Sequence, residues 1–191
     1  ANKIFGQTIP VTKQPSIDMT LKEPIGVVGL IVPWNFPAYM ASWKLGPALA
    51  AGNACILKPA SYSPLTAIRI CELALEAGIP AGVFNLVMGR GRVVGEALVT
   101  NPDVAMVSFT GSTRAGKRIM ELCSQQVKKV ALELGGKSAA IILDDVQLDD
   151  ALLNELLMSG LMNNGQVCGA QSRLLVPRSR YDEIVERIGE G

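Results

Sequence analysis

The stretch IGVVGLIV (25–32) is an unbroken run of apolar and glycine residues, many of them β-branched. Such runs are typical of strands that are buried on both faces of a parallel sheet. PWNFP (33–37) follows at once and breaks the strand, because two prolines flank a short turn. The residues AYMASWKLGPALAAG (38–52) then have helical spacing, and Gly52 ends the helix. The stretch therefore predicts the first strand and helix of an α/β domain.

The same alternation of strand and helix continues along the chain. Four more apolar segments are predicted strands: ACILK (54–58), VFNLVM (83–88), VAMVSFT (104–110) and KKVALEL (128–134). The segments between them are predicted helices: 64–77 with Ser63 as its N-cap, a short helix at 89–101, and a helix from GSTRAG (111–116) to about Gln125. Strands separated by helices form βαβ units, so the predicted fold class is α/β, with a doubly wound, mostly parallel Rossmann-like sheet.

The two ends of the chain differ from this central part. Residues 1–20 alternate weakly and contain two prolines, which predicts an exposed arm of extended segments. After Gly135 the pattern becomes a strand (138–145), a helix (148–162), a polar loop (163–171), a strand (172–177) and the start of another helix. We therefore expect three parts: the arm at 1–20, an α/β domain at 21–134, and the opening part of a second α/β domain at 135–191.

The composition excludes several classes of protein. Of the 191 residues, 49% are hydrophobic, so the chain can bury a substantial core and is not disordered. Its 18 Lys and Arg residues against 17 Asp and Glu give no basic surface of the kind that binds nucleic acid or anionic lipid. No apolar stretch is long enough to span a bilayer, and no secretory signal opens the chain. We expect neither nucleic acid nor a membrane as a partner.

The chain has no histidine, which limits its possible chemistry. Without imidazole it cannot form a Ser–His–Asp triad, a Cys–His pair or a His-ligated zinc site. Its four cysteines are scattered without a CxxC pair, which favours free thiols in a reducing compartment such as the cytoplasm. We therefore expect cysteine or carboxylate chemistry that uses no metal.

Three polar residues are candidates for chemistry, and each has an ordinary structural alternative. Cys168 lies in the polar loop NNGQVCGAQ, where a thiol is unusual, and a nucleophile is the leading explanation. Glu133 ends an apolar strand in ALELGGKS, where carboxylates are also common as solvated strand ends. Asn35, between the prolines of PWNFP, is either a turn residue or an amide directed at an oxyanion.

Two glycine-rich loops follow predicted strands. GSTRAGK (111–117) spells G-x-x-x-x-G-K, but Arg118 stands where a P-loop has the Ser or Thr that holds magnesium. The loop therefore fits a helix N-terminus offered to a phosphate better than a nucleotide-hydrolase site. GRGRVVG (89–95) is one residue longer than the dinucleotide fingerprint, and an ordinary turn explains it equally well.

Five motifs in order resemble the aldehyde dehydrogenase superfamily: PWNFP (33–37), KPA (58–60), FTGST (109–113) with Gly116, ELGGKS (133–138) and GQVC (165–168). The resemblance spans the whole chain, and because members of the family are much longer, it implies an internal segment. It further implies that the domain at 21–134 binds NAD(P), that 135–191 opens the catalytic domain, and that the arm helps to form homodimers or homotetramers.

The resemblance also assigns roles to individual residues. Cys168 would be the nucleophile, Glu133 the general base, and Asn35 with the Cys168 backbone N–H the oxyanion hole. Phe36, Met40 and Trp43 would line the substrate tunnel, although packing of the helix on the sheet explains them nearly as well. The residues assigned to the cofactor are Lys58 and Ser61 at the adenosine ribose, Gly91 near the adenine, Gly111, Ser112, Thr113 and Gly116 under the pyrophosphate, and Trp34 and Leu134.

These roles imply oxidation of an uncharged aldehyde to a carboxylic acid with NAD or NADP, through a thiohemiacetal and a thioester of Cys168. Relatives that pass the acyl group to coenzyme A tend to lack the glutamate, so Glu133 favours hydrolysis. NAD-preferring relatives usually have an acid where this chain has Ser61, so we expect NADP to be accepted at least as well as NAD. A P-loop-like nucleotide-binding domain and a non-catalytic fragment of the same fold are the alternatives.

Overall fold

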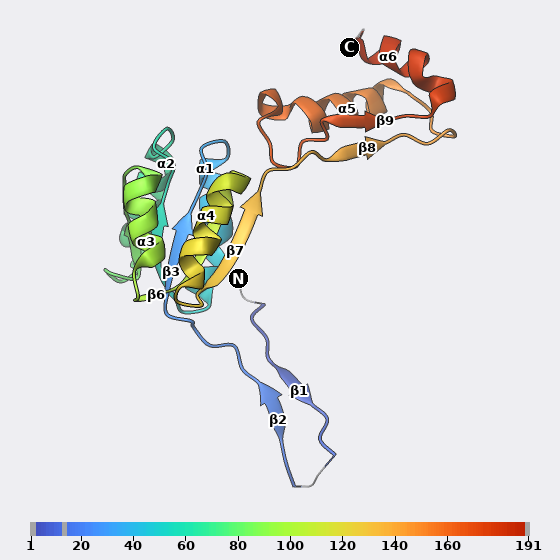
Figure 1. Cartoon of the computed structure of the whole chain (residues 1–191). Helices are drawn as coiled ribbons and strands as arrows, with labels where there is room; N and C mark the ends of the chain where they lie inside the picture. Colours follow the sequence, from blue (N-terminus) through green and yellow to red (C-terminus); the bar gives the residue numbers. More distant parts are fainter. Residues whose placement is uncertain (1–2, 13–14, 190–191) are drawn as a thin grey trace. The chain divides into compact units, whose positions relative to one another are not determined.

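The structure, a computed structural model, describes residues 3–12 and 15–189. The chain divides into two compact units, residues 1–133 (unit 1) and 134–191 (unit 2), and each is described here by itself. Both units combine helices with strands, and Figure 1 labels their elements.

Unit 1 is built on a five-stranded sheet with the order β5-β4-β3-β6-β7. Its strands are β3 (Val27–Ile31), β4 (Ala54–Lys58), β5 (Phe84–Leu86), β6 (Val104–Gly111) and β7 (Lys129–Leu134). The pairs β3–β4, β3–β6 and β4–β5 are parallel. The first strand of this sheet along the chain, β3, therefore lies at the centre, and the order matches five of the six strands of a Rossmann sheet. The predicted α/β class with a mostly parallel, doubly wound sheet is confirmed.

Helices cover both faces of this sheet (Figure 1). Those of unit 1 are α1 (Pro37–Ala50), α2 (Leu65–Glu76), the π turn η1 (Gly91–Gly95), α3 (Glu96–Thr100) and α4 (Thr113–Ser124). Helix α1 packs beside α2 on one face, and α3 packs beside α4 on the other. Connections between parallel strands are right-handed, and after β5 the chain returns to the other side of β3. The helices that follow β5 therefore lie on the opposite face from α1 and α2.

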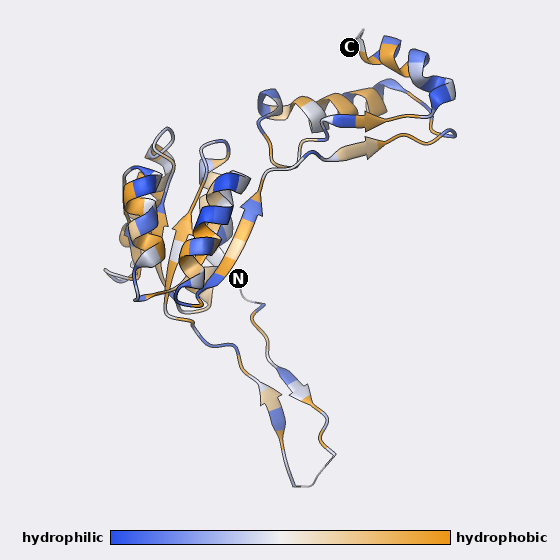
Figure 2. Ribbon diagram, in the orientation of Figure 1, coloured by the Kyte–Doolittle hydropathy of each residue, from blue (hydrophilic) through white to orange (hydrophobic). Residues whose placement is uncertain are grey.

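The main core of unit 1 lies between the sheet and the α1–α2 pair. Its central side chains include Leu30 of β3, Leu57 of β4 and Ala41 of α1, which are almost completely buried. Figure 2 shows apolar residues along the strands and mainly hydrophilic residues on the visible side of α4. Burial of both sheet faces explains why the strands read as continuous apolar runs in the sequence.

Asn53 is a buried polar residue that joins two loops at the edge of this core. Its Oδ1 accepts hydrogen bonds from the backbone N–H groups of Ile25, at 2.7 Å, and Gly26, at 3.1 Å. Its Nδ2 donates to the carbonyl of Ala48 at 3.0 Å. The side chain therefore fixes the entry to β3 against the end of α1.

The start of α2 differs from the prediction. The helix begins at Leu65 with Pro64 in the N-cap position, and no side chain caps it. The Ser63 hydroxyl is buried and has no hydrogen-bond partner among the described residues. The predicted Ser63 cap was wrong because the helix begins one residue later than expected, which places Ser63 before the N-cap position.

The segment predicted as one helix at 89–101 consists of the π turn η1 followed by α3. Gly89, just before the turn, has a φ of 148°, and a side chain there would collide with Val94. This position therefore requires glycine. Strand β5 is also shorter than predicted, because it pairs with β4 only opposite Cys55–Leu57.

The amino-terminal arm forms an antiparallel hairpin of β1 (Gln7–Ile9) and β2 (Asp18–Thr20). All residues of both strands are exposed. The backbone N–H of Gln7 donates to the Thr20 hydroxyl at 2.9 Å. The predicted arm also includes residues 1–2 and 13–14, which lie outside the described residues.

Unit 2 has a small parallel sheet of β8 (Ala139–Ile141) and β9 (Arg173–Leu175). Its helices are α5 (Asp150–Leu161), capped by the Asp149 side chain, and α6 (Tyr181–Gly189), with the 3₁₀ turns η2 (Met162–Gly165) and η3 (Arg178–Arg180). The predicted strand, helix, loop and strand are present, and the final helix begins as expected; residues 190–191 lie outside the described part.

Candidate active site

Strands β3 and β6 lie side by side at the centre of the unit 1 sheet, and the chain leaves them toward opposite faces. Parallel sheets bind ligands in the crevice outside the carboxyl ends of such a strand pair. Trp34 and Asn35 follow β3, Gly111 and Ser112 lie where β6 gives way to α4, and Lys58 ends β4. The sheet thus brings these predicted residues to one edge.

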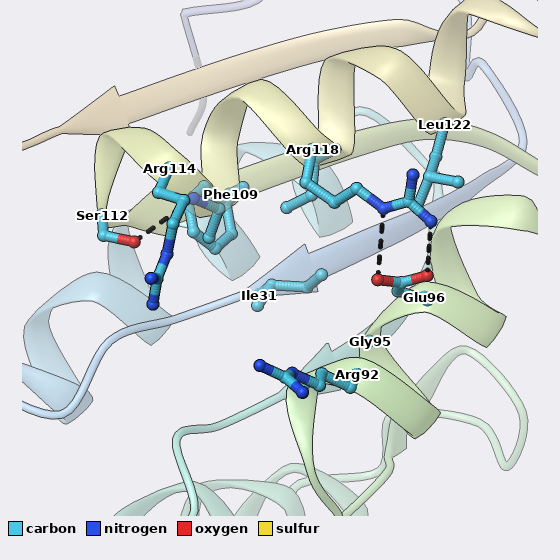
Figure 3. A pocket seen from close by; sticks show the side chains of 12 residues that line it. Ile31, Arg92, Gly95, Glu96, Phe109, Ser112, Arg114, Arg118 and Leu122 are labelled. Carbon is cyan, nitrogen blue, oxygen red and sulfur yellow. Dashed lines mark hydrogen bonds and ion pairs between the residues drawn. The ribbon is translucent and has the colours of Figure 1, made fainter.

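A cavity of about 410 Å³ opens on this edge, between the η1–α3 segment and α4 (Figure 3). Ile31 of β3 and Phe109 of β6 provide apolar lining, and Gly91 and Ser112 contribute from either side. Its charged lining residues are Arg92, Glu96, Arg114 and Arg118. Flat apolar walls with a few convergent polar groups suit a heteroaromatic ring that carries anionic substituents.

Ser112 starts α4 by capping its first turn, because its hydroxyl accepts from the Ala115 N–H at 3.3 Å. The helix already begins at Thr113, so residues 113–117 of GSTRAGK are helical and form no loop around a phosphate. The structure therefore does not support the P-loop alternative. The free N–H groups of the first turn, with Gly116 buried behind them, still suit a phosphate group.

Thr110, the residue before Gly111 in β6, has a buried side chain with 6% of its surface exposed. Its Oγ1 has no hydrogen-bond partner in the part of the chain that the structure describes. An unpaired buried hydroxyl costs about 1–3 kcal/mol. Thr110 is not among the residues that line the cavity, whereas its neighbour Phe109 is, so a ligand in the cavity would not remove this cost.

Lys58 and Ser61 lie at the end of β4 and just beyond it. Lys58 is buried, and its Nζ donates to the Pro59 carbonyl at 3.0 Å. Burial lowers the pKa of its ammonium group. Ser61 is exposed, and its hydroxyl donates to the Gly89 carbonyl at 3.5 Å, so this loop meets the start of the η1 segment.

A second cavity in unit 1, of about 360 Å³, holds Glu133 together with Trp43, Lys44 and Ser108. The Lys44 ammonium donates to the Ser108 hydroxyl at 2.8 Å. Burial lowers the pKa of Lys44, while the nearby Glu133 carboxylate acts in the opposite direction. Lys44 was not predicted as a site residue, because its one signal in the sequence is that it is a lone lysine within the largely apolar helical segment 38–52.

The three residues expected to line a substrate tunnel lie in different surroundings. Met40 is buried in the core beneath α1, and half-buried Phe36 packs against the same core. Trp43 is 53% exposed, and its ring centroid lies 5.7 Å from that of Tyr39. Met40 thus packs α1 on the sheet, which is the structural alternative to lining a tunnel, whereas the ring of Trp43 is exposed on the surface of α1.

Cys168 lies in unit 2, in the loop between η2 and β9, and its side chain is exposed. The turn η2 that leads into this loop contains three consecutive left-handed residues: Asn163 (φ 51°), Asn164 (φ 56°) and Gly165 (φ 73°). Asparagine and glycine tolerate this conformation best, which explains the NNG sequence. The Gln171 N–H donates to the Ser159 carbonyl at 3.0 Å and joins the loop to α5.

The other three cysteines, which like Cys168 lie within the described residues, have different environments. Cys55 and Cys123 are buried and Cys71 is half-buried. Burial raises the pKa of the Cys55 thiol to about 11, and it also raises the pKa values of Cys71 and Cys123. These thiols stay protonated and poorly nucleophilic at neutral pH, which leaves Cys168 as the accessible sulfur.

The family model of the aldehyde dehydrogenase family matches residues 1–191. The chain belongs to this family. It is 48% identical over 189 residues to the aminoacetaldehyde dehydrogenase of Pseudomonas aeruginosa, covering 98% of this chain and 38% of that protein. It is 47% identical over 186 residues to the NADP+-dependent succinate-semialdehyde dehydrogenase GabD of Escherichia coli, covering 97% of this chain and 38% of that protein.

Solved structures agree with this assignment. An NAD+ complex of an aldehyde dehydrogenase from Bacillus cereus superimposes with a TM-score of 0.92 at 46% identity, covering 98% of this chain and 38% of that one. An NADP-dependent enzyme of Escherichia coli gives a TM-score of 0.94 at 46% identity, covering 99% and 39%. The chain thus spans about two fifths of the length of these relatives.

Two further findings concern membranes and metals. In the described ranges, no helix has the length and apolar character needed to cross a bilayer. The same ranges contain no cluster of three or more His, Cys, Asp or Glu side chains that could bind a metal ion.

Proposed function

We propose that the protein containing this chain oxidises an aldehyde to a carboxylic acid with NAD(P)+. The observation that carries the proposal is the contrast among the four thiols: Cys168 is exposed on a polar loop, whereas Cys55 and Cys123 are buried and Cys71 is half-buried with a raised pKa. Membership of the aldehyde dehydrogenase family and the cavity beside the β6–α4 turn support it.

In the first half of the proposed reaction, the Cys168 thiolate adds to the aldehyde carbon and forms a thiohemiacetal. The Asn35 amide and the Cys168 backbone N–H donate hydrogen bonds to the oxygen that becomes negative in this step. Collapse of the oxyanion re-forms the C=O bond and breaks the C–H bond, leaving a thioester on Cys168. A bound nicotinamide supplies the acceptor for the hydride.

In the second half, water attacks the thioester carbonyl and releases the carboxylic acid and the thiol. Glu133 is the proposed base that removes a proton from this water. Its carboxylate is exposed at the end of β7, and the chain has no histidine that could take the role. Hydrolysis, not transfer to coenzyme A, is therefore the proposed fate of the acyl group.

The proposed cofactor contacts follow the edge of the unit 1 sheet. Lys58 and Ser61 would hold the adenosine ribose, Gly91 would lie beside the adenine, and Gly111, Ser112, Thr113 and Gly116 would surround the pyrophosphate. Trp34 and Leu134 complete the proposed set. Ser61 carries no charge that would repel a 2′-phosphate, so NADP is expected to be accepted at least as well as NAD.

The substrate and assembly are also proposals. Trp43 and Phe36 are apolar, which favours an uncharged aliphatic or aromatic aldehyde. The exposed hairpin β1–β2 would take part in a homodimer or homotetramer, where its apolar side chains Ile9 and Met19 would be covered. Four free thiols favour a reducing compartment such as the cytoplasm.

The test replaces Cys168 by Ala in the full-length protein and follows reduced nicotinamide by absorbance with a panel of aldehydes. We expect turnover to fall by at least about a thousandfold, while cofactor binding stays close to that of the wild type. Cys123→Ala is the matched control and is expected to retain catalysis. Undiminished turnover in the Cys168 variant would refute the covalent mechanism.

A further inference from the structure

The cavity beside α4 contains more positive than negative charge. Its lining includes three arginines but a single carboxylate, Glu96 (Figure 3). One of the arginines, Arg118, is neutralised: it contacts Glu96 through Nε at 3.3 Å and Nη2 at 3.0 Å, and Glu121 through Nη1 at 3.0 Å. Glu96 has its pKa lowered mainly by this pair.

The other two arginines, Arg92 and Arg114, form no ion pair within the described ranges of the chain. They lie on opposite walls of the cavity, Arg92 on η1 and Arg114 on the first turn of α4 (Figure 3). Arg92 is near enough to Glu96 to help lower the pKa of that carboxyl, but it makes no direct ion pair with it. Two guanidinium groups whose N–H donors are not held by a carboxylate favour a ligand that carries anionic groups at two separate points.

The two walls suit different anionic groups of one nucleotide. Arg114 stands beside Ser112, where the first turn of α4 offers its N–H groups, and it would accompany the pyrophosphate. Arg92 belongs to the wall that meets the end of β4. Carbons of the Lys58 side chain lie 3.8 Å from the place a Cβ would occupy on Gly95, and the Ser61 hydroxyl reaches the Gly89 carbonyl.

We propose that Arg92 is a specificity-determining residue that binds the 2′-phosphate of NADP. The inference rests on the proposed function, because it assumes that the adenosine ribose lies at Lys58 and Ser61. A guanidinium on the neighbouring turn can then donate two parallel hydrogen bonds to a phosphate attached to that ribose. A free ribose hydroxyl offers no such charge, so NAD would gain little from Arg92.

Arg90 provides a matched control on the same segment. It is exposed, as Arg92 is, and lies two residues earlier, but it is not among the residues that line the cavity. Replacing either arginine by Gln removes one positive charge from the segment. A general electrostatic effect would therefore appear in both variants, whereas a direct phosphate contact would appear only in Arg92→Gln.

The experiment measures kcat/KM with NADP+ and NAD+ for full-length wild type, Arg92→Gln and Arg90→Gln. In parallel, calorimetry measures binding of adenosine 2′,5′-bisphosphate and of 5′-AMP, which requires no catalysis. We expect Arg92→Gln to lower kcat/KM for NADP+ and affinity for the bisphosphate by about tenfold or more. The values for NAD+ and AMP should stay within about twofold, and Arg90→Gln should change neither.

The outcomes separate the inference from the proposed function. Selective loss of bisphosphate binding in Arg92→Gln supports the inference even if no aldehyde is oxidised, in which case the proposed function fails alone. Equal losses for both nucleotides, or no loss, overturn the inference while leaving aldehyde oxidation intact. A wild type that does not bind the bisphosphate overturns the inference as well.

Discussion

Units 1 and 2 differ in how much of their structure is held by a shared core. Unit 1 places a five-stranded sheet between two pairs of helices, and its central strands β3, β4 and β6 are mostly buried. In unit 2 the two strands are largely exposed or half-buried, and the buried apolar side chains within the described residues are Ile142, Leu153, Ala170 and Ile184.

This difference shows that the proposed cofactor residues and the proposed nucleophile are held in place by different kinds of structure. The proposed cofactor residues lie at strand ends of a rigid sheet, so their positions depend on the core. The proposed nucleophile lies on a loop whose shape is set by left-handed residues and a few local backbone hydrogen bonds. Local stability varies across a protein, and such loops belong to its less stable part.

After the loss of Cys168, the largest expected effect comes from Glu133 of unit 1, which is proposed to act in the second half of the reaction. Glu133→Gln keeps the size of the side chain but removes the base, so the thioester should form and hydrolyse slowly. We expect steady-state turnover to fall by about a hundredfold or more. Rapid mixing should still give a burst of about one reduced cofactor per active site.

The matched control is Glu76→Gln, which removes an exposed carboxylate on α2 that pairs with Arg69 at 2.9 Å. An exposed pair of this kind contributes little to stability, so turnover should not change. Loss of the burst in Glu133→Gln would show that Glu133 acts before the thioester forms.

A second prediction tests whether the units unfold separately. Leu57 is fully buried in β4, and Leu57→Ala should lower the free energy of unfolding of unit 1 by about 3 kcal/mol. Both tryptophans, Trp34 and Trp43, belong to unit 1, so fluorescence during denaturation of the 191-residue chain reports on that unit. Leu153→Ala in unit 2 should leave this transition within about 0.5 kcal/mol. Equal shifts in both variants would show that the chain unfolds as one cooperative body.

The smallest expected effect concerns a polar contact within unit 1. Asn53→Ala leaves the backbone N–H groups of Ile25 and Gly26 without their partner, whereas the Ala48 carbonyl still accepts from the Asn53 backbone N–H, and we expect a loss of about 2 kcal/mol by the same fluorescence assay. Asn101→Ala is the control, because the Asn101 side chain accepts one exposed hydrogen bond, from the Asp103 N–H. If the two variants lost equal stability, burial would not be the source of the effect.

The sequence predicted the elements whose signal is local. IGVVGLIV and ACILK read as buried strands because both of their faces are covered, and GSTRAG was correctly placed at the start of α4. The alternation of strands and helices predicted a doubly wound sheet but not the order of its strands. Cys168 stood out because a thiol in a polar loop needs an explanation.

The remaining features depend on residues that are distant in the sequence. Lys44, Arg92 and Arg114 looked like ordinary helical surface residues, and only the folded sheet brings them to cavities. Asn53 resembled a turn residue, yet it bonds to groups more than 25 residues away. The Ser63 cap failed for another reason, because a shift of one residue at a helix start is beyond what sequence signals resolve.

The strand order of unit 1 has a consequence for how the chain is made. Of its five strands, β3 leaves the ribosome first and lies at the centre, then β4 and β5 extend the sheet on one side, and β6 and β7 on the other. Each later strand thus pairs with a neighbour that has already been synthesised. Domains fold in this vectorial way during translation. Cys168 follows the last strand of this sheet in the chain, so all five strands are synthesised before the reactive sulfur is.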